Sequence, residues 1–118
     1  MRRMTHPAPP RPSPSRSPLM VKLCLSLICS PSSEEQVLDE LLQIQGDNLF
    51  TSSMAFSHGL APTRMAASEQ VLGRSASAVV QVIVEESAMP PLITHLAHAF
   101  KGTGIRYWVT VVVMDGEM

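Results

Sequence analysis

The residues best suited to bind a ligand gather in one stretch, His58 to Arg74, whose pattern is neither that of a strand nor clearly that of a helix. Glu69, Gln70 and Arg74 place a carboxylate, an amide and a guanidinium within six residues. The planar guanidinium of Arg74 suits a phosphate or a carboxylate, and Gly73 permits a sharp re-entry into the next strand. An ion pair between Glu69 and Arg74, within the loop or between subunits, is an equally valid interpretation.

Histidines are the second group of candidates. We expect His58, followed by Gly59, at the end of a strand, as a metal or anion ligand or as an exposed turn residue. His58 and Glu69 together are the best candidate metal ligands. His95 and His98 have a spacing on a predicted helix that can chelate a metal, but no third ligand lies near them in the sequence. Because nucleophile–base pairs, paired carboxylates and a CxxC motif are all missing from the sequence, we do not expect an enzyme.

Length and charge restrict the function further. A chain of 118 residues has room for one domain with one core. Residues 1–18 contain four arginines, no acid and six of the ten prolines, which predicts a disordered tail before a folded domain at 19–118. The rest of the chain has five basic and ten acidic residues, a balance that argues against binding nucleic acid.

We expect a cytoplasmic protein that does not itself span a membrane. The sequence has no run of about 20 apolar residues, which a membrane-spanning helix requires. Cys24 and Cys29 are five residues apart on a predicted strand, so they point to opposite faces and cannot pair with each other. Two buried, reduced thiols are the expected state.

Hydrophobic periodicity predicts the elements that position these residues. Residues 19–29 alternate as a strand, with Leu23, Leu25 and Leu27 on one face. A helix follows, with Ser32 and Glu35 as a capping box and Gly46 just beyond its end. Residues 49–57 form a weaker strand, which leads into the candidate loop.

The second half repeats this order of elements. Residues 75–86 form a strand, and Ser87 is the predicted cap of a helix with Pro90 and Pro91 in its first turn. Gly102 ends that helix, and residues 105–114 form the last strand. Residues 101–104 lack the spacing of a phosphate-binding P-loop, so we interpret them as a plain connection from helix to strand.

The order strand, helix, strand, strand, helix, strand predicts an α+β, ferredoxin-like βαββαβ fold. Two helices would cover one face of a four-stranded antiparallel sheet. Alternation places six apolar residues on the other face: Cys24, Ile28, Val79, Ile83, Trp108 and Val112. Because apolar surface of this extent favours association, we expect a homo-oligomer whose sheets face inward.

Several short segments resemble one known family. They are Lys22-Leu23, Leu27-Ile28 with Pro31, Phe50-Thr51-Ser52, His58-Gly59, Glu69-Gln70-Val71 with Gly73-Arg74, and Tyr107-Trp108-Val109. Together they resemble an uncharacterised bacterial family of PII-like proteins, whose genes often neighbour those of heavy-metal efflux pumps. The resemblance covers about residues 20–116 and leaves out the tail.

This resemblance implies a PII-like or CutA-like trimer with clefts between subunits. Residues 58–74 lie where the signalling loop of such proteins should be, and would act on a ligand or on a membrane transporter in metal resistance. The implied ligand set is His58, Gly59, Glu69, Gln70, Gly73 and Arg74. The alternative is a CutA-like metal-binding protein that uses His58 and Glu69, with His95 or His98 of a neighbouring subunit.

The chain departs from nitrogen-regulatory PII proteins in two respects. The segment 58–74 contains no tyrosine that could be uridylylated, and the connection 101–104 is shorter than their usual ATP-holding loop. These departures argue against the nucleotide and 2-oxoglutarate sensing of those proteins. A divalent metal ion and a nucleotide are the two candidate ligands.

Overall fold

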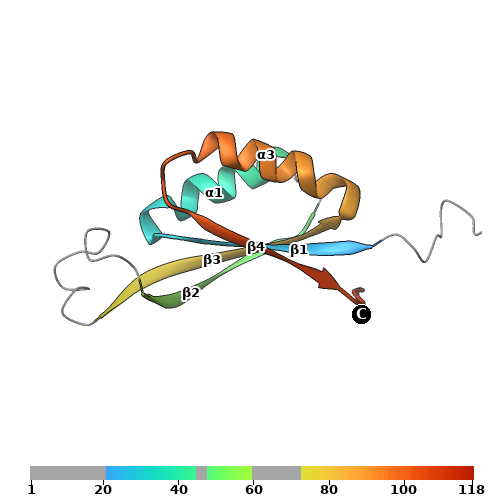
Figure 1. The fold of residues 1–118 in the computed structure, drawn as a ribbon. Coiled ribbons are helices and arrows are strands. Elements are labelled where there is room, and N and C mark those ends of the chain that lie inside the picture. The colour runs from blue at the N-terminus through green and yellow to red at the C-terminus, as the bar shows by residue number, and fades with distance from the viewer. Residues whose placement is uncertain (1–20, 45–47, 60–72) are drawn as a thin grey trace, which may run out of the picture.

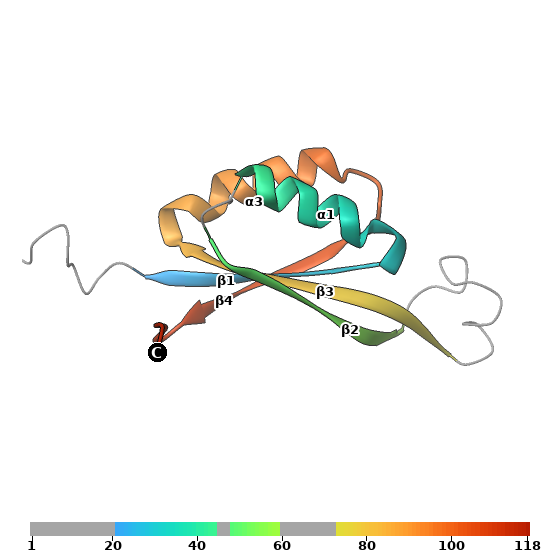
Figure 2. The same cartoon turned by 180° about the vertical axis from the view of Figure 1, so that it is seen from behind.

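The fold is an antiparallel sheet covered on one face by two helices. A computed structural model describes residues 21–44, 48–59 and 73–118. The elements are β1 (Lys22–Cys29), α1 (Pro31–Ile44), β2 (Phe50–His58), β3 (Arg74–Glu85), the 3-10 turn η3 (Glu86–Ala88), α3 (Met89–Ala99) and β4 (Arg106–Val112). The sheet order is β2-β3-β1-β4, and every pair of neighbouring strands is antiparallel. The helices lie on the same side of this sheet (Figures 1 and 2). The predicted ferredoxin-like fold is confirmed; the tail at 1–18 lies outside the described residues.

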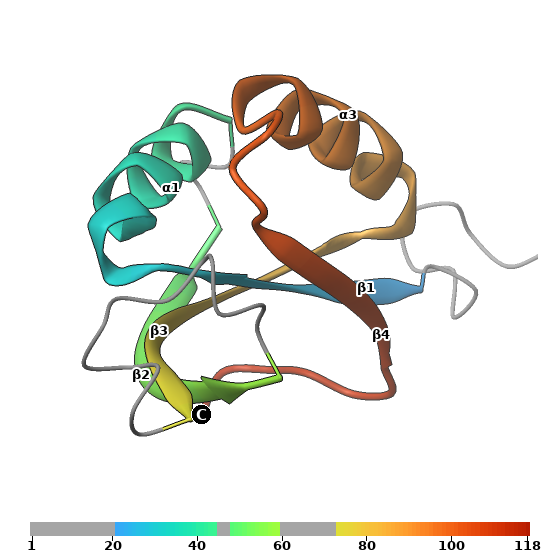
Figure 3. The same cartoon turned by 60° about the vertical axis from the view of Figure 1, so that its left-hand side comes forward.

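The core lies between the helices and the two central strands. Leu25 pairs with Val82 and Leu27 with Val80, so strand alternation points all four side chains toward the helices. Each of the four is 5% exposed or less. The helices lie side by side over this surface (Figure 3). They contribute five more buried side chains: Val37, Leu41, Met89, Leu92 and Leu96.

Helix α1 begins at Pro31, before the predicted cap Ser32. Proline suits the first helical position because its φ is already helical and its missing N–H would be unpaired there. The carbonyl of Ser30 accepts a hydrogen bond from the Ser33 N–H (3.0 Å), and the Ser30 hydroxyl lies 2.9 Å from that of Ser32. Ser32 is therefore inside the first turn, and its prediction as the cap is wrong. Gly46 lies outside the described residues.

The start of α3 also differs from the prediction. Ser87 lies in the turn η3, and Ala88, which precedes the helix, makes no side-chain cap. Pro90 and Pro91 do lie in the first turn. A 3-10 turn thus leads into α3 in place of a serine cap.

Among the described residues, no helix is long and apolar enough to cross a membrane.

The paired ends of β2 and β3 extend past the helices, toward the left in Figure 1. His58 pairs with Arg74 in register, so both residues belong to strands and not to the loop we predicted between them. Met54 and Phe56 face the helix side, yet they are 64% and 58% exposed. The guanidinium carbon of Arg74 lies 4.1 Å from the centre of the Phe56 ring, a cation–π contact.

The face of the sheet away from the helices, here called the open face, is apolar over only part of its area. The register places all six predicted residues on it: Cys24, Ile28, Val79, Ile83, Trp108 and Val112. Polar pairs lie between and beside them, with Gln81 Nε2 donating to Ser26 Oγ (3.0 Å) and the Ser57 and Ser77 hydroxyls 2.6 Å apart. The expectation of an apolar face holds at these six positions on β1, β3 and β4 and is wrong for β2, whose open-face residues are small and mostly hydroxyl-bearing.

Cys29 should react much more slowly in the folded protein than in the unfolded chain. Burial, with a smaller contribution from the Glu34 carboxylate, raises the pKa of this thiol above its ordinary value of 9.0, and the side chain is 5% exposed. Because the thiolate is the nucleophile, we expect alkylation by iodoacetamide to slow at least about tenfold on folding. Peptide mass spectrometry with and without urea measures this ratio.

The same raised pKa makes stability depend on pH. The folded state keeps the Cys29 proton to a higher pH than the unfolded chain does. The free energy of unfolding therefore falls as the pH rises above about 9. The burial assigned to Cys29 would be refuted by equal alkylation rates in the folded and urea-unfolded protein.

Candidate functional site

One end of the sheet forms a pocket of about 390 Å³, here called the sheet-end pocket. The antiparallel order brings the last residues of β1 and β2 beside the first residues of β3 and β4, at the left in Figure 1. The pocket therefore combines segments that are far apart in the sequence. Its polar lining includes Ser30, Ser33, Ser57, His58, Thr103 and Arg106.

The structure brings together only some of the predicted site residues. His58 and Gly59 line the sheet-end pocket, and Gly59 has a φ of +80°, a conformation that favours glycine. Gly73, with a φ of +70°, precedes the facing strand and Arg74 begins it, but neither is part of the lining. Glu69 and Gln70 lie outside the described residues, so their role and the Glu69–Arg74 ion pair stay predictions.

Arg106 is the main residue that the sequence analysis missed. It opens β4 on the open face, opposite Ile28, and its side chain is exposed. It takes part in neither of the two ion pairs found among the described residues, which are Lys22–Asp115 and His95–Glu40. Counting back two residues from Trp108 along the strand would have placed it on the open face.

Hydroxyl groups form much of the remaining wall. Ser77 is buried and lies 2.6 Å from the Ser57 hydroxyl, while Ser30 and Ser33 add two hydroxyls at the start of α1. Thr103 donates its own hydroxyl to the carbonyl of Phe100 (2.6 Å), which holds the turn before β4 in place. No carboxylate belongs to the described lining. Hydroxyls beside a guanidinium suit an anion.

The described residues offer little for a metal ion. They contain no group of three or more His, Cys, Asp or Glu side chains that could hold one. The Nε2 atom of His95 lies 2.8 Å from the Glu40 carboxylate, which links α3 to α1, and His98 is exposed. His95 is therefore hydrogen-bonded to a carboxylate within the helix layer. Metal binding by His58 with Glu69 stays a prediction.

Solved structures share this fold. A DUF3240 family protein from Shewanella baltica has a TM-score of 0.67 at 16% identity, over 82% of this chain and 96% of that one. The nitrogen regulatory PII-like protein CPII from Thiomonas intermedia, bound to ADP, AMP and bicarbonate, has a TM-score of 0.63 at 16% identity (83% and 97%). GlnK from B. subtilis in complex with ATP has a TM-score of 0.59 at 14% identity (79% and 83%). The fold is thus that of PII-like proteins.

The family assignment comes from the sequence itself. The model of the DUF3240 family, described as a protein of unknown function, matches residues 20–118, and the chain belongs to this family. None of the curated proteins matches it. The expected membership of an uncharacterised PII-like family is therefore confirmed, and the match leaves out residues 1–18, as the resemblance did.

Proposed function

We propose that this protein is a non-catalytic PII-like sensor that binds a small anionic ligand in the sheet-end pocket. The observation that carries the proposal is that one pocket is lined both by His58, where β2 leaves the sheet toward β3, and by Arg106, at the start of β4. A ligand held there would contact the base of the β2–β3 connection directly. Its binding would bias the conformation of that connection and so reach a partner protein.

The lining indicates the class of ligand. A guanidinium, a histidine and several hydroxyls favour a phosphate, a carboxylate or bicarbonate. The volume of about 390 Å³ is within the range of about 300–1,000 Å³ that is typical of small-molecule pockets. The ligands of CPII (ADP, AMP and bicarbonate) and of GlnK (ATP) are the first to test. Glu69 and Gln70 would complete the site from the connection, with Gly73 and Arg74 beside them at the start of β3.

Association of several copies is part of the proposal. Ile83 and Trp108 are 36% and 46% exposed on the open face, beside Cys24 and Val112. An apolar area of this kind favours burial against another copy. We propose a trimer with the open faces inward, in which the hydroxyl-bearing residues of β2 lie toward the rim.

The partner proposed for the β2–β3 connection is a membrane transporter of heavy-metal efflux. Its support is the resemblance of motifs such as His58-Gly59 and Tyr107-Trp108 to a family often encoded beside such pumps. The ends of β2 and β3 that flank the connection lie past the helix layer (Figure 1).

Thermal unfolding with a ligand panel tests the proposal. We expect at least one of ADP, AMP, ATP, bicarbonate or orthophosphate to raise Tm by at least about 4 °C at saturation, because a ligand that binds only the folded state stabilises it. The bound ligand should be recovered chemically intact. Zinc and copper belong in the same panel, applied to the native protein and to His58→Ala. Stabilisation by metal alone, lost in His58→Ala, would support the metal-binding alternative instead, and no shift with any anion would refute the sensor proposal.

A further inference from the structure

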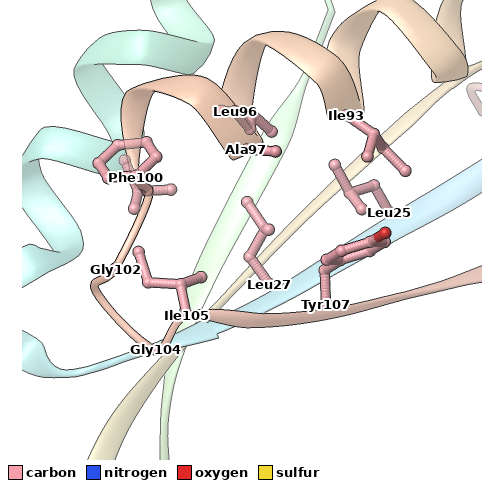
Figure 4. A pocket seen from close by; sticks show the side chains of 11 residues that line it. Leu25, Leu27, Ile93, Leu96, Ala97, Phe100, Gly102, Gly104, Ile105 and Tyr107 are labelled. Atoms are coloured by element: carbon pink, nitrogen blue, oxygen red, sulfur yellow. The ribbon is translucent and has the colours of Figure 1, made fainter.

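A second pocket, of about 230 Å³, lies in the helix layer between α3, β1 and β4 and is here called the helix-side pocket. Figure 4 shows its side chains converging from these elements. Leu25, Leu27 and Leu96 form its buried floor and inner wall, at 0%, 5% and 6% exposure. Phe100 and Tyr107 stand nearer its mouth. The pocket is thus an open extension of the core.

The connection between α3 and β4 forms one wall of this pocket, through Gly102, Gly104 and Ile105. The hydroxyl and the N–H of Thr103 both donate to the carbonyl of Phe100, at 2.6 and 3.2 Å, which closes the connection into a tight turn. Gly102 and Gly104, with φ of +81° and +79°, allow the turn to bend in this way. These hydrogen bonds fix the turn to the end of the helix. Tyr107, also in the lining, is 52% exposed.

The lining and the size define the occupant. Every lining side chain is aliphatic or aromatic apart from the glycines, and the Tyr107 hydroxyl is the polar group among them. A cavity of about 150 Å³ lined by Leu, Ile and Phe is enough to bind benzene. The present pocket is larger than that by about one half, but much smaller than the space that a packed helix or strand fills. One or two rings fit it.

We propose that the helix-side pocket binds a small aromatic or branched aliphatic molecule, with a polar substituent directed to the Tyr107 hydroxyl. The inference goes beyond the anion sensor proposed above, and it does not depend on assembly, because the pocket opens on the helix side and the proposed contact between copies uses the open face. The two pockets share Gly104 and Ile105 in their walls. A ligand on one side of this turn therefore lies close to the other site.

Methyl NMR with indole as the probe tests the proposal on the full chain. We expect saturable shifts, in the millimolar range, of the methyl groups of Leu25, Leu27, Leu96 and Ile105, with NOEs from indole protons to these groups. Val111 lies on the same face of β4, outside the pocket, and should not shift. Equal shifts at Val111 and in the pocket would mean non-specific adsorption and would overturn the proposal.

Two variants that each replace an alanine of α3 with phenylalanine provide a test and its matched control. Ala97 lines the mouth and Ala99 is an exposed position on the same helix outside the lining. Ala97→Phe should weaken indole binding at least about tenfold by filling the mouth, and Ala99→Phe should leave it unchanged. Orthophosphate binding should be the same in both variants, which separates this site from the sheet-end pocket. Loss of indole binding in both variants, or NOEs showing that a second copy fills the pocket, would refute the proposal.

Discussion

Replacement of Trp108 with glutamate should convert the assembled protein into single chains of 12.8 kDa. Trp108 lies on the open face opposite Ser26 and is 46% exposed in the isolated chain. In the proposed assembly its ring is buried against another copy, where a carboxylate without a partner is strongly unfavourable. We expect the dissociation constant of the assembly to rise more than about 100-fold, because central aromatic residues dominate the binding energy of such interfaces.

Light scattering coupled to size exclusion measures this change, and the same strand supplies the control. Val111 points to the helix side of β4 and is 67% exposed, so Val111→Glu adds the same charge without entering the proposed contact. The native protein and Val111→Glu should both elute with three times the mass of one chain. A native protein that is monomeric at micromolar concentration, or equal dissociation by the two variants, would contradict inward-facing sheets.

Replacement of Arg106 with glutamine should weaken anion binding by about 10- to 100-fold, since hydrogen bonds to charged groups contribute roughly 1.5–3 kcal/mol. The guanidinium lines the sheet-end pocket and takes part in neither described ion pair, so it is available to a ligand. Glutamine keeps part of the length and the hydrogen-bonding capacity but loses the charge and the two-pronged geometry. Calorimetry with the anion that stabilises the native protein best gives the ratio of Kd values.

Lys101→Gln is the control for charge alone. Lys101 is exposed in the connection from α3 to β4, a few residues before Arg106, and does not line the sheet-end pocket. This variant therefore removes an equal charge nearby. Its Kd should stay within about twofold of the native value, because exposed charges outside a site are largely screened. An unchanged Kd in Arg106→Gln, or equal losses in both variants, would show that Arg106 is not a ligand-binding residue.

Strand alternation made the fold predictable from the sequence. The two apolar faces of β1 and β3 could be assigned directly, since residues such as Leu25 and Val82 fall on one side and Cys24 and Ile83 on the other. The starts of the helices were less predictable. Ser32 matched a capping pattern, yet the proline before it was itself able to begin α1. Ser87 matched a cap for α3, but it lies inside the 3-10 turn that precedes this helix.

The site was less predictable than the fold. His58 was found because a histidine at the end of a strand is visible in one short segment, whereas the hydroxyls and Arg106 come from several segments that only the sheet order brings together. The polar half of the open face was missed for a different reason. Serines and a threonine alternate along β2, but the prediction considered only the apolar residues of the sheet.

Hydrogen exchange of the peptides that span residues 56–75 tests the central claim, that a ligand in the sheet-end pocket acts on the β2–β3 connection. We predict slower exchange of these amides when saturating ADP, AMP or bicarbonate is added to the native protein, because a ligand that contacts both His58 and Arg106 would hold the end of β2, where the connection starts. Arg106→Gln at the same ligand concentration should show much less of this protection. Exchange that is the same with and without every one of these anions, or protection that is equal in Arg106→Gln, would contradict the claim.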